Sequence, residues 1–139
     1  MIDLGYSSFL IHLFSDYWLQ NDWMALNKKK HFWIALVHAI VYTIPFLLLT
    51  KSILALSVIC ITHAIIDHTD IVCRFNQIKN WDFEKHTLQT GTIQPFGLTT
   101  FIDFFDGYSD RPPFIRVWLI IIQDNILHLI INYCALRWL

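Results

Sequence analysis

Long apolar stretches with few polar interruptions dominate the chain, and this pattern predicts an all-α fold. Four stretches are expected to be membrane-spanning helices, at about residues 4–20, 32–50, 52–67 and 114–136. The second contains no Asp, Glu, Lys or Arg, and its 19 residues approach the roughly 20 that cross a bilayer core. Thr50-Lys51-Ser52 leaves only a tight turn between it and the third, so these two helices should form an antiparallel hairpin. Pro45 should kink the second helix, and we predict an integral membrane four-helix bundle forming a single membrane domain over residues 1–139.

Composition supports a membrane protein and excludes several other classes. Charged residues make up 15% of the 139 residues, against roughly 25% in ordinary soluble domains, and 55% are hydrophobic. Mean hydropathy is +0.47. Ten basic residues are balanced by eleven acidic ones, so no excess positive charge attracts DNA or RNA. We therefore expect membrane lipid, and no nucleic acid, as the partner.

The basic residues predict the orientation of the four helices. Eight of the ten fall between the first and second helices, or between the third and fourth and at the start of the fourth. Short loops rich in Lys and Arg stay in the cytoplasm, so both termini should lie outside in a bacterial inner membrane. The eight are Lys28, Lys29, Lys30, Arg74, Lys79, Lys85, Arg111 and Arg116, and only Lys51 and Arg137 fall on the other side.

The connection between the third and fourth helices, residues 68–113, is the longest stretch outside the predicted spans. Within it Leu98, Phe101, Ile102 and Phe105 recur at helical spacing, with polar residues between them. This pattern predicts a cytoplasmic amphipathic helix lying on the membrane surface. The segment would be either a plain connector or a lid over a site.

The ionisable residues inside the predicted spans follow one pattern. Three His–Asp pairs are each separated by four positions, and one further His stands in the second span. Residues four apart lie on one face of a helix, so each pair can direct two side chains at one spot. Imidazole and carboxylate are typical zinc ligands, and ionisable groups at membrane depth tend to mark function. The candidate metal ligands are therefore His12, Asp16, His38, His63, Asp67, Asp124 and His128.

All four spans place these residues in the half of the membrane that faces the cytoplasm. This agreement favours a divalent metal site, with Zn²⁺ expected and Mn²⁺ or Fe²⁺ also compatible. Seven candidates exceed the four ligands of one tetrahedral site. They would serve two ions bridged by a carboxylate, or one ion with an outer layer of hydrogen-bond partners. A metal-free His–Asp hydrogen-bond network or proton relay, and coincidence, stay open as alternatives.

A sequence motif begins at the first of these pairs and continues into the following connection. It reads H-x3-D-[FY]-x2-Q-x-D-W-M-x2-N-K, and it resembles the opening motif of the domain of unknown function 3307 family, small bacterial and phage membrane proteins. The family also has a His in the second span, H-x3-D at the end of the third and D-Q-x2-H in the last. This chain has Asn125 where that Gln is usual, and Thr69-Asp70 where a Lys tends to follow. The opening motif is matched at His12, Asp16, Tyr17, Gln20, Asp22, Trp23, Met24, Asn27 and Lys28.

The layout is also similar, more loosely, to that of small membrane-bound metal-dependent hydrolases. This likeness and the site's depth suggest a hydrolase at the cytoplasmic membrane face, acting on a lipid or lipid-linked phosphoester. Asp16 would act as the general base instead of a ligand. Gln20, Asp22 and Asn27 would hold the head group, and Lys28 would pair with a phosphate.

A second hypothesis is a non-enzymatic membrane module. It would carry metal ions or protons, or interact with the cell envelope, and the His/Asp cluster would be a transport site or a stabilising network. The outer halves of the spans hold few polar residues, which tells against a transport path. A soluble helical bundle buried in a larger assembly is the third alternative, and the asymmetry of basic residues argues against it.

Overall fold

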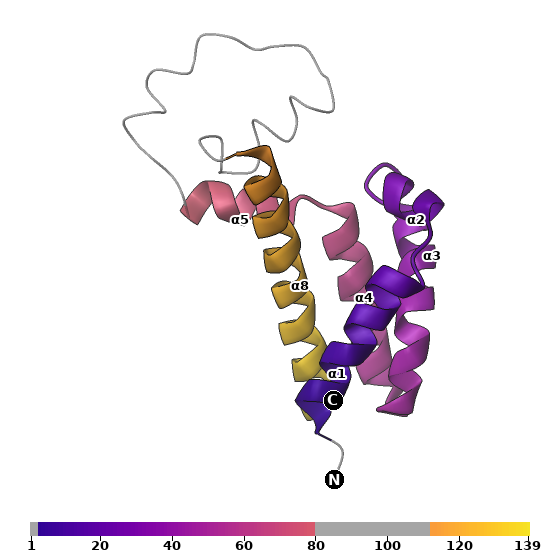
Figure 1. Ribbon diagram of the computed structural model, residues 1–139. Helices are drawn as coiled ribbons and strands as arrows, with labels where there is room; N and C mark the ends of the chain where they lie inside the picture. The colour runs from indigo at the N-terminus through magenta and orange to yellow at the C-terminus, as the bar shows by residue number, and fades with distance from the viewer. Residues whose placement is uncertain (1–2, 80–111) are drawn as a thin grey trace. The chain divides into compact units, whose positions relative to one another are not determined.

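The structure, a computed structural model, describes residues 3–79 and 112–139 (Figure 1). Every regular element within these residues is helical, which confirms the all-α class. The chain groups into two compact units, Met1–Thr69 with Asp124–Leu139, and Asp70–Gln123, and the candidate ligands all lie in the first. The elements are α1 (Leu4–Leu13), the π-helical turn η1 (Phe14–Trp18), α2 (Asp22–Asn27), α3 (Phe32–Thr43), the 3₁₀ helix η2 (Ile44–Leu48), α4 (Ile53–His68), α5 (Ile71–Lys79) and α8 (Pro113–Trp138).

Helices α3 and α4 pack side by side in the first unit (Figure 1). The α-helical geometry of α3 ends at Thr43, and η2 follows, because Pro45 lacks the N–H that an α-helix needs. Pro45, which predicted a kink, therefore lies at the start of a tighter 3₁₀ helix. Ser52 then caps α4, since its Oγ accepts a hydrogen bond from Ala55 N at 3.3 Å.

The apolar core of the first unit joins four elements. Tyr42 of α3, Phe46 of η2, Ile59 of α4 and Ala135 of α8 are almost completely buried against one another. Ser52 Oγ also donates to the Leu139 carbonyl at 3.0 Å, so the beginning of α4 and the end of α8 meet at the same end of this unit. These apolar contacts adjoin the histidines, because Tyr42 also stacks on the ring of His63.

Three local features differ from the predicted spans. The predicted helix at 4–20 changes to a π-helical turn at Phe14, and the short helix α2 follows it. Asn21 caps α2 by accepting a hydrogen bond from Met24 N at 2.9 Å. Helix α5 lies inside the connection 68–113, where the sequence predicted a helix only around Leu98–Phe105. The amphipathic helix predicted around Leu98–Phe105 lies outside the described residues.

One helix of the described residues, Phe114–Trp138 within α8, is long and apolar enough to cross a membrane. The apolar helices Phe32–Leu48 and Ile53–His68 are shorter. This single candidate span is weak evidence of membrane association, and the four-span bundle stays a prediction. The single domain predicted over residues 1–139 stays a prediction as well.

Candidate metal centre

Four side chains from three elements meet in the interior of the first unit. Each offers one ligand atom, and these four atoms all lie within 4.8 Å of one another. The side chains of the two histidines and of one aspartate are at most 2% exposed, and the other aspartate is 10% exposed. We call this group the central cluster, and its members are Asp16 of η1, His38 of α3, and His63 and Asp67 of α4.

The distances within the central cluster fit a tetrahedral metal site. Asp16 Oδ1 lies 3.1 Å from His38 Nε2 and 3.7 Å from His63 Nε2. Asp67 Oδ2 lies 3.3 and 3.2 Å from the same two nitrogens, which are 3.1 Å apart. Zinc–ligand bonds of about 2.0–2.2 Å put neighbouring ligands of a tetrahedron about 3.3–3.6 Å apart. The central cluster can therefore hold a metal ion with little movement.

The local structure explains how each side chain reaches this point. His63 and Asp67 are one turn apart on α4, so they face the same side of that helix. His38 is fully buried on the face of α3 that packs against α4. Asp16 lies in the π-helical turn, a distortion that often occurs at functional sites. The wider turn changes the direction in which Asp16 points relative to the preceding α-helix.

A second group shares Asp67 with the central cluster. His128 Nε2 lies 3.8 Å from Asp67 Oδ1 and 3.5 Å from Asp124 Oδ2. Asp124 and His128 are one turn apart on α8, as the spacing predicts, and the Asp124 side chain is 34% exposed. We call Asp67, Asp124 and His128 the second group; their ligand atoms also lie within 4.8 Å of one another. Of the seven candidates, the structure thus brings six into two overlapping groups.

His12 lies outside both groups, although it is fully buried. Its Nδ1 is 2.8 Å from the Tyr42 hydroxyl, and its Nε2 is 2.6 Å from Asn125 Oδ1. Tyr42 also accepts a hydrogen bond from Asn132 Nδ2 at 2.5 Å. His12 Nε2 lies 4.0 Å from Asp16 Oδ2. Both ring nitrogens of His12 are therefore occupied by hydrogen bonds, and the residue supports the site from outside.

Of the four predicted substrate-binding residues, Lys28 contacts the central cluster, and Gln20 contacts Lys28. Lys28 Nζ donates to Asp67 Oδ2 at 3.0 Å and to Gln20 Oε1 at 2.8 Å. Asn27 Nδ2 instead donates to the Trp23 carbonyl on its own helix, and Asp22 is exposed in the first turn of α2. Within the described residues, neither Asn27 nor Asp22 bonds to the clustered side chains. The ammonium of Lys28 partly balances the two buried carboxylates.

Our reading of the sequence gave no role to Tyr42, Asn125 or Asn132. Tyr42 stacks on the ring of His63, with ring centroids 3.6 Å apart and an interplanar angle of 13°. Tyr42 follows His38 by four positions, and Asn132 follows His128 by four. The spacing rule that identified the His–Asp pairs would therefore have found both residues, had it been extended to uncharged polar side chains.

Comparison with known proteins agrees with the motif. The family model described as "Protein of unknown function (DUF3307)" matches residues 6–93, a range that contains Asp16, His38, His63 and Asp67. No curated protein and no solved structure gives a significant match to the chain. The family match covers more than half of the 139 residues. The chain belongs to the DUF3307 family of proteins of unknown function.

Proposed function

We propose that this protein is a membrane-embedded, divalent-metal-dependent hydrolase of the bacterial inner membrane. Its substrate would be a lipid or lipid-linked phosphoester, reached from the cytoplasmic face. The observation that carries the proposal is the central cluster, in which two imidazole nitrogens and two carboxylate oxygens converge at distances suited to one ion. Zn²⁺ is the expected ion, and Mn²⁺ or Fe²⁺ would also accept these ligands.

The distribution of polar side chains supports the membrane part of the proposal. In the first unit the buried residues include His12, His38, His63 and Asn132, whereas large apolar side chains lie on the outside. A soluble bundle has the opposite arrangement, because water favours polar side chains outside. Ionisable residues in membrane bundles face the interior. The exposed apolar residues include Phe14, Ile40, Ile44, Ile61, Ile65, Ile126 and Ile130.

The two carboxylates of the central cluster suggest different roles. Asp67 is 2% exposed, lies 3.2–3.3 Å from both histidine nitrogens, and would be a ligand together with His38 and His63. Asp16 is 10% exposed and would accept a proton from the attacking water. A divalent ion held by three protein ligands makes water acidic enough to supply a nucleophile near neutral pH.

Lys28 is placed to contact an anionic substrate. Its ammonium lies beside the central cluster and is held by Gln20 and Asp67, while its side chain remains 17% exposed. A Lys ammonium in this position would pair with a phosphate oxygen as the substrate approaches the ion. Asp22 and Asn27 belong to the adjacent helix α2 and would contact the rest of the head group.

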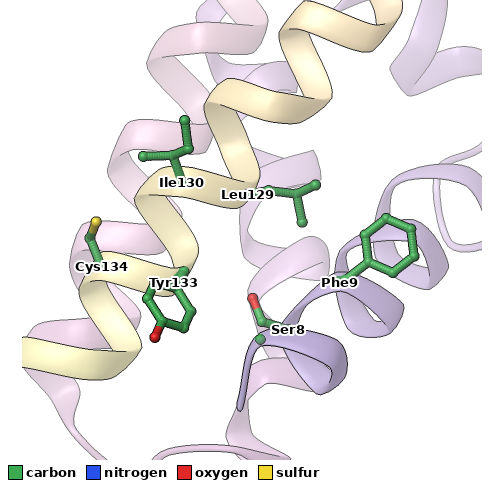
Figure 2. Close-up of a pocket in the computed structure, with 7 residues that line it drawn as sticks. Ser8, Phe9, Leu129, Ile130, Tyr133 and Cys134 are labelled. Atoms are coloured by element: carbon green, nitrogen blue, oxygen red, sulfur yellow. The ribbon is translucent and has the colours of Figure 1, made fainter. Parts of the chain in front are cut away.

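A cavity suited to an apolar chain lies along α1, the helix that carries His12. Its volume is about 330 Å³, and it opens between α1 and α8 (Figure 2). Ser8, on its wall, precedes His12 by four residues, which is about 6 Å along α1. A lipid with its phosphate at the central cluster could place part of its tail here. The cavity is lined by Gly5, Ser8, Phe9, Leu129, Ile130, Tyr133 and Cys134.

The experiment separates metal binding from hydrolysis. The protein is purified in detergent without chelator, its metal content is measured, and hydrolysis of phosphatidic acid, phosphatidylglycerol and a polyprenyl diphosphate in mixed micelles is followed. We expect Asp16→Asn to keep the ion and to lose about 100-fold or more in rate. The matched control is Asp3→Asn, because Asn caps α1 as well as Asp does. Absence of bound metal, or full activity of Asp16→Asn, would contradict the proposal.

A non-enzymatic membrane module is the second candidate, and one observation favours it. If both Asp16 and Asp67 ligate the ion, the site has four protein ligands, as closed structural zinc sites do. The module would then carry metal, or interact with the envelope, through a metal-stabilised bundle. This candidate predicts stoichiometric metal, a large fall in Tm on chelation, and no hydrolysis of any of the three lipids.

A further inference from the structure

The rings of His63 and His128 contact each other through their Nδ1 atoms. Their Nδ1 atoms are 3.1 Å apart, and both residues are about 1% exposed. His63 belongs to the central cluster through Nε2, and His128 to the second group through Nε2. This contact therefore connects the two groups that could hold metal.

A hydrogen bond between two Nδ1 atoms contains one hydrogen. A neutral imidazole carries a hydrogen on one nitrogen and a lone pair on the other. If the hydrogen belongs to His63, then Nε2 of His63 has a lone pair for a metal, and Nε2 of His128 carries a hydrogen. If it belongs to His128, these assignments are reversed. The two histidines consequently cannot both ligate metal through Nε2 while this contact is made.

A centre with two ions would need a hydrogen on each Nδ1 atom. Two N–H groups would then point at each other across 3.1 Å, and the rings would have to separate. The ring of His63 has little freedom to move, because Tyr42 stacks on its face at 3.6 Å. Tyr42 is itself held by His12 and Asn132. The buried packing therefore opposes a second ion.

The choice between the two groups follows from their ligands. The central cluster offers four atoms from side chains that are at least nine-tenths buried. The second group offers three, and Asp124 is 34% exposed. An ion in the central cluster also has two imidazole nitrogens, whereas the second group has one. Whether or not Asp16 is a ligand, the second imidazole nitrogen and the deeper burial favour Zn²⁺ in the central cluster.

We infer that the protein binds one ion per chain, in the central cluster, and that His128 is not a ligand but a positioning residue for His63. His63 Nδ1–H donates to His128 Nδ1, and His128 Nε2–H is directed toward the carboxylates of Asp124 and Asp67. Their oxygens, at 3.5 and 3.8 Å, are farther than an ordinary hydrogen bond, so Asp124 must turn slightly to accept it. This inference rests on the metal site of the proposed function, but not on hydrolysis.

Metal counting tests the inference. The full-length protein in detergent is loaded with Zn²⁺ and desalted, and the ions per chain are measured for the wild type, His63→Gln and His128→Gln. We expect one ion in the wild type, one in His128→Gln with about 10–100-fold weaker affinity, and none in His63→Gln. Gln at position 128 can still accept the hydrogen bond from His63. His31→Ala, at an exposed position, is the control and should match the wild type.

Two ions in the wild type and one in His128→Gln would overturn the inference and leave the proposed function standing. No ion in the wild type would overturn both. If His128→Gln does not fold, Asp124→Asn replaces it and should retain one ion. Binding of Co²⁺ gives a second readout, because its visible spectrum depends on the ligands. The spectrum should be unchanged in Asp124→Asn and His128→Gln, and a shifted spectrum would identify His128 as a ligand.

Discussion

His63 is the most constrained side chain of the candidate site. One ring nitrogen faces His38, Asp16 and Asp67, the other faces His128, and Tyr42 covers one face of the ring. Spacing in the sequence could predict that His63 and Asp67 share a helix face. Extended to hydroxyl groups, the same spacing would place Tyr42 on the face of His38, but not against the ring of His63, because that contact is between two helices. Nor could it predict that the π-helical turn separates His12 from the central cluster.

Substituting Tyr42→Phe tests the hydrogen bonds around His12. The change removes a hydroxyl that bonds to His12 and Asn132, but it keeps the ring that stacks on His63. Two buried polar groups lose a partner, and we expect the free energy of unfolding to fall by about 1–3 kcal/mol. Chemical denaturation in detergent measures it, with the exposed Tyr6→Phe as the control. Loss of the bound metal in Tyr42→Phe would show that this network does more than support the fold.

Substituting Lys28→Met tests the charge balance of the central cluster. In the metal-free protein the Lys28 ammonium offsets the carboxylate of Asp67, so its removal should lower Tm. A divalent ion supplies that positive charge, and saturating Zn²⁺ should therefore raise the Tm of Lys28→Met more than that of the wild type. Lys30→Met, at an exposed position of the same connection, should behave like the wild type. An equal rise of Tm with Zn²⁺ in Lys28→Met and in the wild type would contradict this charge balance.

At the scale of the helices, the apolar pattern located the main elements well. The bounds of α4 and α8 differ from the predicted ones by one or two residues, because both helices are regular. The pattern did not predict the π-helical turn or the 3₁₀ segment in place of a kink, since both keep the same apolar residues and differ only in backbone hydrogen bonds. It also missed α2 and α5, which are six and nine residues long.

Ser52→Ala tests how the start of α4 is fixed. The Ser52 hydroxyl caps α4 and also donates to the carbonyl of Leu139 at the end of α8. Replacing a capping Ser by Ala costs about 1 kcal/mol, and the lost bond to Leu139 adds to this. We expect the free energy of unfolding to fall by about 1–2 kcal/mol. Ser57→Ala, at an exposed position of the same helix, should be neutral, and an equal loss in both variants would rule out the cap as the cause.

At the scale of the whole molecule, composition and charge placement are the strongest signals in the sequence. The low charge content predicted a membrane protein, and in the first unit Ile, Leu and Phe side chains are exposed while the clustered histidines are buried. Charge content does not give the number of spans. Helix α3 with η2, and helix α4, are shorter than a bilayer core requires. Polar side chains at their ends and a local thinning of the bilayer can compensate for such a mismatch.

The placement of basic residues predicts the orientation of the whole molecule in the membrane. Eight of ten basic residues fall in the two connections predicted to be cytoplasmic or at the start of the fourth helix, so Lys30 should face the cytoplasm and Asp3 the outside. The three native cysteines are replaced by alanine, and Asp3→Cys or Lys30→Cys is introduced. A membrane-impermeant maleimide should label Asp3→Cys in spheroplasts, and Lys30→Cys only after lysis. The reverse labelling would invert the orientation and move the central cluster to the outer face, and recovery of the protein without detergent would contradict a membrane location.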